Sequence, residues 1–173
     1  MELNGNQLKP LETLQTLKES LGESKRIVFP KRITRIGVYG VVIFHGKILL
    51  IEQESGPCAG LLDFPGGGIE FGESPEEALR REFAEEVAMT FDSLKLLDNL
   101  TTVDNVPGIG ESEPYTFYRV GMIYHVIDPL VISSEMSGEL KYNMYDWTKL
   151  SEDKCSPLLW QFLKELKIGE VPQ

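Results

Sequence analysis

The stretch that decides the fold is Gly66-Gly67-Gly68-Ile69-Glu70-Phe71-Gly72-Glu73-Ser74-Pro75-Glu76-Glu77-Ala78-Leu79-Arg80-Arg81-Glu82-Phe83-Ala84-Glu85-Glu86-Val87-Ala88-Met89. A flexible glycine run leads into a segment with three agreeing signals of a helix start. Ser74 is a preferred N-cap residue, Pro75 suits the first helical position, and Glu77 completes a capping box. The sequence therefore predicts a helix that begins directly after the glycine run.

This predicted helix has one apolar face and one acidic face. The apolar face carries Leu79, Phe83 and Val87, and the adjoining face carries Glu82, Glu85 and Glu86. Carboxylates at such spacing repel one another, and Arg81 alone cannot neutralise them. A solvated acidic face is one interpretation, but the preceding glycines let backbone approach a metal or an anion, which favours a divalent cation site.

The same stretch resembles the Nudix box, G-x5-E-x7-R-E-U-x-E-E-x-G-U, in which U is a bulky apolar residue. The matching residues are Gly67, Glu73, Arg81, Glu82, Phe83, Glu85, Glu86 and Met89. Ala88 replaces the final glycine of the motif. Because glycine adopts positive φ at low cost, this replacement concerns the turn that ends the helix and removes no predicted ligand.

The resemblance implies an α/β fold, a Nudix-type α/β/α sandwich with a mixed β-sheet. We expect the Nudix domain to span residues 33–173 and an N-terminal helical extension to span residues 1–32. In the extension, leucines recur at steps of three and four over residues 7–21, which is typical of an amphipathic helix. It is interpreted either as a dimerisation or lid element, giving a homodimer in the first case, or as a helix packed on its own domain, and the second is favoured.

Patterns outside the box are compatible with this fold. Residues 36–44 and 48–51 predict a hairpin around His45-Gly46-Lys47, and residues 94–103, 115–126 and 141–147 predict further strands. A long loop is expected at residues 104–114 and a turn at Asp128-Pro129. Ser156-Pro157 predicts the start of a last helix with an apolar face.

Composition excludes several classes of protein. A chain of 173 residues fits one domain with an appendage, and its net charge of −10 argues against binding polymeric nucleic acid. No apolar run is long enough to cross a membrane, and no signal sequence is recognisable, so a cytoplasmic location is expected. Cys58 and Cys155 do not form a recognisable disulfide or metal pattern and are expected to be reduced.

The resemblance also implies the chemistry. It predicts hydrolysis of the pyrophosphate bond in a nucleoside diphosphate linked to another moiety, such as a nucleotide sugar, an ADP-ribose-like compound, a dinucleotide or an NTP. Glu82, Glu85 and Glu86 would bind Mg²⁺ or Mn²⁺, with the Gly67 carbonyl as a further ligand. Arg81 would support the site by orienting Glu82 or by pairing with Glu73.

Several points stay open at this level. The general base is either Glu82 or the downstream Glu139, with Glu135 and Glu113 as weaker alternatives. A catalytically silent Nudix-like domain that binds a nucleotide is the alternative function, and isomerase chemistry would require a reactive Cys58. Substrate specificity is expected from the loops at residues 54–60, 104–114 and 133–140.

Overall fold

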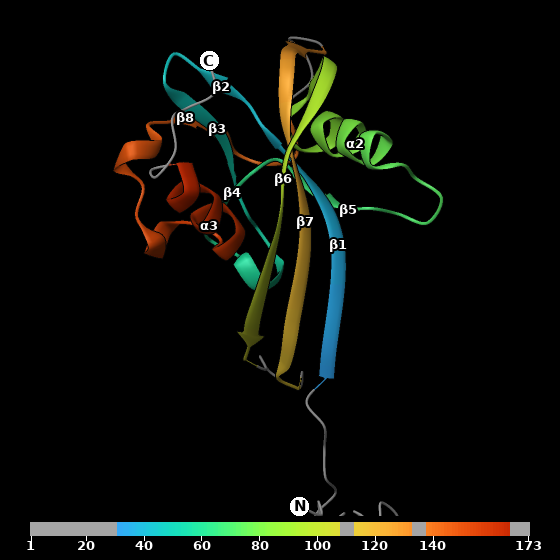
Figure 1. Ribbon diagram of the computed structural model, residues 1–173, viewed down its shortest axis with the longest axis vertical. Helices are drawn as coiled ribbons and strands as arrows, with labels where there is room; N and C mark the ends of the chain where they lie inside the picture. Colours follow the sequence, from blue (N-terminus) through green and yellow to red (C-terminus); the bar gives the residue numbers. More distant parts are fainter. Residues whose placement is uncertain (1–30, 108–112, 133–137, 167–173) are drawn as a thin grey trace, which may run out of the picture. The chain divides into compact units, whose positions relative to one another are not determined.

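The computed structural model describes residues 31–107, 113–132 and 138–166 (Figure 1). The chain divides into two units, Met1–Pro30 and Lys31–Gln173, and every described residue belongs to the second unit. The amphipathic helix predicted at residues 7–21 therefore lies outside the described residues.

The larger sheet has the strand order β5-β1-β7-β6. Strands β1 and β7 run parallel, whereas β1 pairs antiparallel with β5 and β7 pairs antiparallel with β6, so the sheet is mixed as expected. The strands are β5 (Gly66–Gly68), β1 (Lys31–Val41), β7 (Tyr115–Val131) and β6 (Met89–Val106). The glycine run is thus an edge strand, held against the centre of β1 by Gly37–Gly68, Val38–Gly67 and Tyr39–Gly66 pairs.

A smaller antiparallel sheet is centred on one strand, β3, which pairs with β2, β4 and β8. These strands are β2 (Ile43–Phe44), β3 (Lys47–Glu52), β4 (Leu62–Asp63) and β8 (Tyr142–Tyr145), and short 3₁₀ segments lie at Gly56–Cys58, Trp147–Lys149 and Glu152–Lys154. Strand β4 leads within two residues into the glycine run. The smaller sheet therefore delivers the chain to the predicted site.

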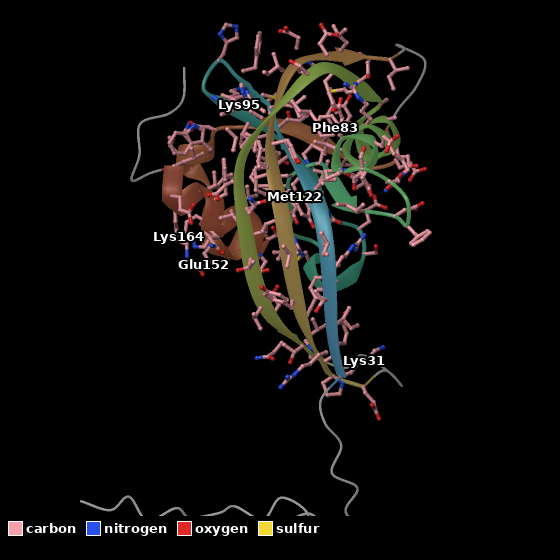
Figure 2. The ribbon with its side chains drawn as sticks, turned by 45° about the vertical axis from the view of Figure 1, so that its right-hand side comes forward. Lys31, Phe83, Lys95, Met122, Glu152 and Lys164 are labelled. Carbon is pink, nitrogen blue, oxygen red and sulfur yellow. The ribbon has the colours of Figure 1, made fainter. Side chains whose placement is uncertain are left out.

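Two helices, α2 (Pro75–Val87) and α3 (Pro157–Leu166), lie on opposite sides of the long strands (Figure 1). On one side, Leu79, Phe83 and Val87 of α2 pack into a buried cluster with Val38 and Val126. Figure 2 shows Phe83 at the boundary between α2 and the strands. On the other side, the α3 residues Leu158, Leu159, Phe162 and Leu163 pack with Tyr39, Leu100 and Ile123. Two cores on two faces make the predicted α/β/α sandwich.

The predicted hairpin is present, but its first strand is divided. His45 and Gly46 have φ values of 48° and 72°, the left-handed backbone that a tight two-residue hairpin turn requires. The expectation of one continuous strand over residues 36–44 is wrong, because the chain leaves the larger sheet after Val41 and enters the smaller one at Ile43. Val41, Val42 and Ile43 form an uninterrupted apolar run because both sheets bury apolar side chains, so the pattern hides the break.

The turn predicted at Asp128-Pro129 is also wrong, because β7 continues to Val131. Pro129 pairs with Phe91 of β6 on one side only, since the pairing of β1 with β7 ends at Val41–His125. A proline without an N–H is tolerated where a strand has an open edge. The preceding residue, Asp128, has a left-handed backbone conformation with a φ of 50°. The strand predicted at residues 141–147 is shorter than expected, and the loop predicted at residue 104 begins later, after Val106.

Candidate functional site

The helix start predicted from Ser74 and Pro75 is confirmed. The Ser74 hydroxyl accepts a hydrogen bond from the Glu77 N–H at 3.3 Å, and the Glu77 carboxylate accepts one from the Ser74 N–H at 2.8 Å. This reciprocal pair satisfies two N–H groups that the first helical turn leaves without partners. Helix α2 therefore begins at a fixed position relative to the glycine run.

Ala88 ends helix α2 in a left-handed conformation, with φ of 51° and ψ of 39°. Its N–H donates to the Phe83 carbonyl, which closes the last turn of the helix. The backbone thus adopts the geometry for which glycine is favoured, although an alanine occupies the position.

The acidic face of α2 lies along the glycine run. The Glu86 carboxylate accepts a hydrogen bond from the Gly66 N–H at 2.8 Å, and the Glu82 carboxylate occupies the space that a Cβ on Gly67 would need. Glycine at position 67 is therefore required by close packing of a carboxylate against the backbone. Burial raises the pKa of Glu82, and burial raises the pKa of Glu86 to about 8.

The carbonyl group of Gly67 points toward β1. The carbonyl oxygen lies 2.7 Å from the position that a Cβ on Gly37 would take, whereas the neighbouring Gly68 carbonyl accepts a hydrogen bond from Arg81 at 3.1 Å. Consecutive carbonyl groups of the run therefore point to different sides. The predicted role of the Gly67 carbonyl as a metal ligand stays a prediction.

Arg81 connects the two ends of the box. Its guanidinium donates to the Glu73 carboxylate at 2.8 and 3.1 Å, to Glu82 at 2.9 Å and to Glu85 at 3.3 Å. The Glu73 hydrogen bonds raise the pKa of Arg81, and the Arg81 hydrogen bonds lower the pKa of Glu73. Both expected partners, Glu73 and Glu82, contact the same guanidinium, which holds the Glu82 carboxylate in place.

A cavity of about 300 Å³ lies beside these carboxylates. Among the predicted site residues, those that line it are Gly67, Glu82, Glu85, Glu86 and Glu139. Glu139 arrives from a distant part of the chain, and its N–H donates to the Glu85 carbonyl at 2.9 Å at the end of α2. Arg81 lies outside the cavity lining, and so does Glu113, while Glu135 lies outside the described residues.

The sequence did not single out Asp63, Arg119 or Arg35, which also line the cavity. Asp63 and Arg119 are buried and form an ion pair of 3.0 Å, and Arg119 also donates to the Cys58 thiol at 2.9 Å. Burial raises the pKa of Asp63, and the Arg119 guanidinium opposes that shift. One signal was available, because Arg119 follows Phe117 by two residues and so points to the same, inward face of its strand.

The carboxylates are chemically suited to a divalent cation. Among residues 31–107, 113–132 and 138–166, no three acidic, histidine or cysteine side chains already converge closely enough to enclose a metal ion. The donor set nevertheless fits one, because Glu82 and Glu86 are partly buried carboxylates beside Glu85, and Mg²⁺ and Mn²⁺ prefer such oxygen donors. A bound cation would offset the cost of burying these negative charges.

The fold and site together define the class of α/β/α sandwich in which a helix presents carboxylates to a glycine run. The family model of the NUDIX domain matches residues 33–150, and the chain belongs to this family. The predicted membership of the Nudix family is thereby confirmed.

Two curated proteins are similar over part of their length. An ADP-ribose pyrophosphatase of Methanocaldococcus jannaschii is 32% identical over 106 residues, which cover 61% of this chain and 54% of that protein. An 8-oxo-dGTP diphosphatase of Escherichia coli K12 is 50% identical over 42 residues, which cover 24% of this chain and 33% of that protein. The chain thus spans about half and one third of the length of these relatives.

Solved structures agree on the fold. A NUDIX hydrolase from Nitrosomonas europaea matches with a TM-score of 0.60 and 21% identity, covering 80% of this chain and 91% of that one. A MutT NUDIX hydrolase from Burkholderia pseudomallei matches with a TM-score of 0.58 and 22% identity, covering 78% of this chain and 98% of that one. In the described part of the chain, neither helix has the length and apolar character that a membrane span needs.

Proposed function

We propose that this domain is a divalent-metal-dependent pyrophosphohydrolase that cleaves the diphosphate of a small nucleoside diphosphate derivative. The observation that carries the proposal is the position of Glu86, a partly buried carboxylate whose pKa is raised to about 8 beside a second partly buried carboxylate, Glu82. Such a cluster is costly without a cation, and both groups face the same cavity. Family membership and the printed activities of the two curated relatives support the same reaction class.

The residues proposed to hold the cation are Glu82, Glu85 and Glu86, with Mg²⁺ or Mn²⁺ as the ion. When bound, a divalent cation neutralises the diphosphate and makes water more acidic. The Gly66 N–H fixes one oxygen of Glu86, and Arg81 fixes Glu82, so both carboxylates are held before a ligand arrives. This preorganisation lowers the entropic cost of assembling the site.

Two groups compete for the role of general base. Glu82 is engaged by Arg81 at 2.9 Å, and this contact favours its ionised form. Glu139 lines the same cavity, and a backbone hydrogen bond to the Glu85 carbonyl holds it at the end of α2. We propose Glu139 as the general base because Glu82 is already committed to Arg81 and to the cation.

The alternative functions receive less support. A catalytically silent nucleotide-binding domain is disfavoured by the intact set of carboxylates at the cavity. Isomerase chemistry through Cys58 is disfavoured because burial raises the pKa of its thiol, which opposes the nucleophilic thiolate, and this effect is larger than the opposing effect of the Arg119 guanidinium.

The test is a hydrolysis screen with Mg²⁺ and Mn²⁺ against NTPs, dinucleoside polyphosphates, ADP-ribose, nucleotide sugars and NADH. We expect turnover of at least one diphosphate compound, and a loss of about a thousandfold or more in Glu86→Gln. Glu76→Gln is the matched control, since Glu76 lies on the same helix, is exposed and pairs with Arg80 away from the cavity. The hypothesis fails if nothing is hydrolysed or if Glu86→Gln retains wild-type activity.

Further measurements separate the remaining alternatives. Glu139→Gln should lower kcat while leaving metal affinity unchanged, whereas a Glu82 base would make Glu139→Gln as active as wild type. Turnover in ¹⁸O-labelled water identifies the phosphorus that is attacked, because the label appears in only one of the two products.

A further inference from the structure

Both acidic and basic side chains line the cavity beside the box. Arg35 and Arg119 are the two cationic side chains among the described residues that line it, and the acidic ones are Glu54, Asp63, Glu82, Glu85, Glu86 and Glu139. In a chain with a net charge of −10, two arginines in one small cavity are a conspicuous concentration of positive charge.

Arg35 and Arg119 are direct cross-strand neighbours. They form a register pair between the parallel strands β1 and β7, so both side chains leave the sheet on the same face. Like charges in this relationship destabilise a sheet unless an anion compensates them. Arg119 has its compensation in the buried ion pair with Asp63 at 3.0 Å.

Arg35 has no such compensation. It is exposed and takes part in none of the ion pairs within residues 31–107, 113–132 and 138–166. Its field lowers the pKa of Glu82, although burial of that carboxyl is the larger effect and raises the pKa overall. One guanidinium at the cavity is therefore neutralised, and the other is available to a ligand.

The third glycine of the run is explained by the same residue. A Cβ on Gly68 would lie 2.7 Å from the Nε atom of Arg35, so the guanidinium lies across the β5 backbone. One residue earlier, the Glu82 carboxylate lies against Gly67. Arg35 and Glu82 thus approach adjacent glycines from the two faces of this short edge strand, and both line the same cavity. A diphosphate in that cavity could meet both the Arg35 guanidinium and a cation held by the carboxylates.

We propose that Arg35 is a substrate-binding residue that binds a phosphate group of the diphosphate through its guanidinium. A guanidinium can donate two parallel hydrogen bonds to a phosphate group, and this interaction is stronger in a cavity with restricted water. Arg119 is neutralised by Asp63 and is therefore not assigned a contact with the ligand. This assignment rests on the proposed function, since it supposes that a diphosphate occupies the cavity.

The experiment measures binding rather than turnover. Methylenediphosphonate, which has a non-hydrolysable P–C–P bridge, is titrated by calorimetry into the full-length protein with Mg²⁺ at fixed ionic strength. We expect Arg35→Gln to weaken binding at least tenfold, which is about 1.4 kcal/mol. The affinity of Arg35→Lys should lie between those of wild type and Arg35→Gln, because lysine keeps the positive charge but cannot donate two parallel hydrogen bonds.

The matched control is Arg32→Gln, which removes the same charge from the same strand but from its opposite face and outside the cavity lining. It should change affinity by less than twofold. A second variant, Gly68→Ala, keeps every charge and pushes the Arg35 guanidinium aside, and it should weaken binding at least threefold. Because that displacement involves the end of a flexible side chain, the variant is expected to fold even if Arg35→Gln does not.

The outcomes distinguish this inference from the proposed function. The inference is overturned if the wild type does not bind the probe, if Arg35→Gln and Gly68→Ala both bind within twofold of wild type, or if Arg32→Gln loses as much as Arg35→Gln. An Arg35-dependent affinity without any turnover in the substrate screen would leave Arg35 as a diphosphate ligand and reject the hydrolase. Turnover in the screen together with binding that does not depend on Arg35 would support the hydrolase and reject Arg35 as a diphosphate ligand.

Discussion

The Arg119 guanidinium lies 3.0 Å from the Asp63 carboxylate, joining β7 to β4 across 56 positions of the chain. Both side chains are buried, and the Nε atom of Arg119 is a buried donor that lacks a hydrogen-bond partner in the described part of the chain. The pair connects the larger sheet to the smaller one directly before the glycine run. It is therefore a structural support of the cavity as well as a part of its lining.

We predict that Asp63→Asn lowers the free energy of unfolding by about 3 kcal/mol or more, because it leaves a buried guanidinium without a counter-ion. The double variant Asp63→Leu with Arg119→Met should recover most of this loss, since two apolar side chains leave no charge uncompensated. Urea denaturation of both variants measures the difference.

The exposed pair Lys149–Asp146 provides the comparison for this prediction. It is 2.9 Å long, but the Lys149 side chain is 82% exposed. Lys149→Ala should therefore cost less than about 1 kcal/mol. Equal losses in Lys149→Ala and Asp63→Asn would show that burial does not determine the worth of the Asp63–Arg119 pair.

Arg81→Lys should reduce both stability and activity. A lysine ammonium cannot reproduce the two bonds to Glu73 together with the contact to Glu82. We expect a loss of about 1 to 2 kcal/mol in unfolding free energy and about a tenfold or larger fall in kcat/KM for the substrate found in the screen.

Arg80→Lys separates these two effects. Arg80 is adjacent in sequence and donates to Glu76 and to the Phe91 carbonyl, but it does not line the cavity. Its replacement should lower stability by a similar amount and leave kcat/KM within twofold. A comparable fall in activity for both variants would contradict the role of Arg81 in positioning Glu82.

The raised pKa of Glu86 predicts how the metal-free protein responds to pH. The folded-state pKa of about 8 exceeds the reference value of 4.5, so the folded state binds this proton more tightly than the unfolded chain. The resulting stability is complete below about pH 4.5 and is lost as the pH rises through 8. With EDTA present, wild type should lose on the order of 4 kcal/mol between pH 5 and pH 9 relative to Glu86→Gln, because each unit of pKa shift corresponds to about 1.4 kcal/mol.

The measurement is chemical denaturation of both proteins at several pH values, with and without Mg²⁺. Since a cation bound by Glu86 favours the ionised carboxylate, Mg²⁺ should abolish most of the difference at high pH. Parallel stability curves for wild type and Glu86→Gln across this pH range in EDTA would reject the assigned burial of Glu86.

Ala88→Gly should leave the protein equally stable or make it slightly more stable, by up to about 1 kcal/mol. Glycine removes the cost of a left-handed alanine, and the loss of one buried methyl group offsets part of that gain. The same substitution at Ala84, inside α2, should instead destabilise the protein by about 1 kcal/mol. Thermal unfolding of the two variants measures the difference. The prediction is contradicted if Ala88→Gly destabilises the protein as much as Ala84→Gly does.

The local elements were readable from the sequence because local interactions form them. The capping box at Ser74 and Glu77, the start of α3 at Pro157 and the turn at His45-Gly46 each depend on residues a few positions apart. The sequence also predicted the strands correctly, because residue preferences are local, but it did not predict where they end. Pairing partners decide where a strand ends, and those partners lie far away in the chain.

The strand errors illustrate this limit. Val42 lies between two sheets that both bury apolar side chains, so no change of pattern marks the boundary. Pro129 reads as a turn residue, yet it continues β7 because β1 no longer pairs there. A sequence pattern reports the preference of each residue, whereas the available hydrogen-bond partners depend on the assembled sheet.

The sequence by itself determined the family, the α/β/α class and the helix that carries Glu82, Glu85 and Glu86, because the box is one continuous stretch with local signals. Only the tertiary structure decided what surrounds that helix. It brought Glu139 to the end of α2, paired Asp63 with Arg119, and set Arg35 beside Arg119 on one side and against Gly68 on the other. These relationships join residues that are distant in the chain, so strand order and register create them, and no short-range pattern encodes them.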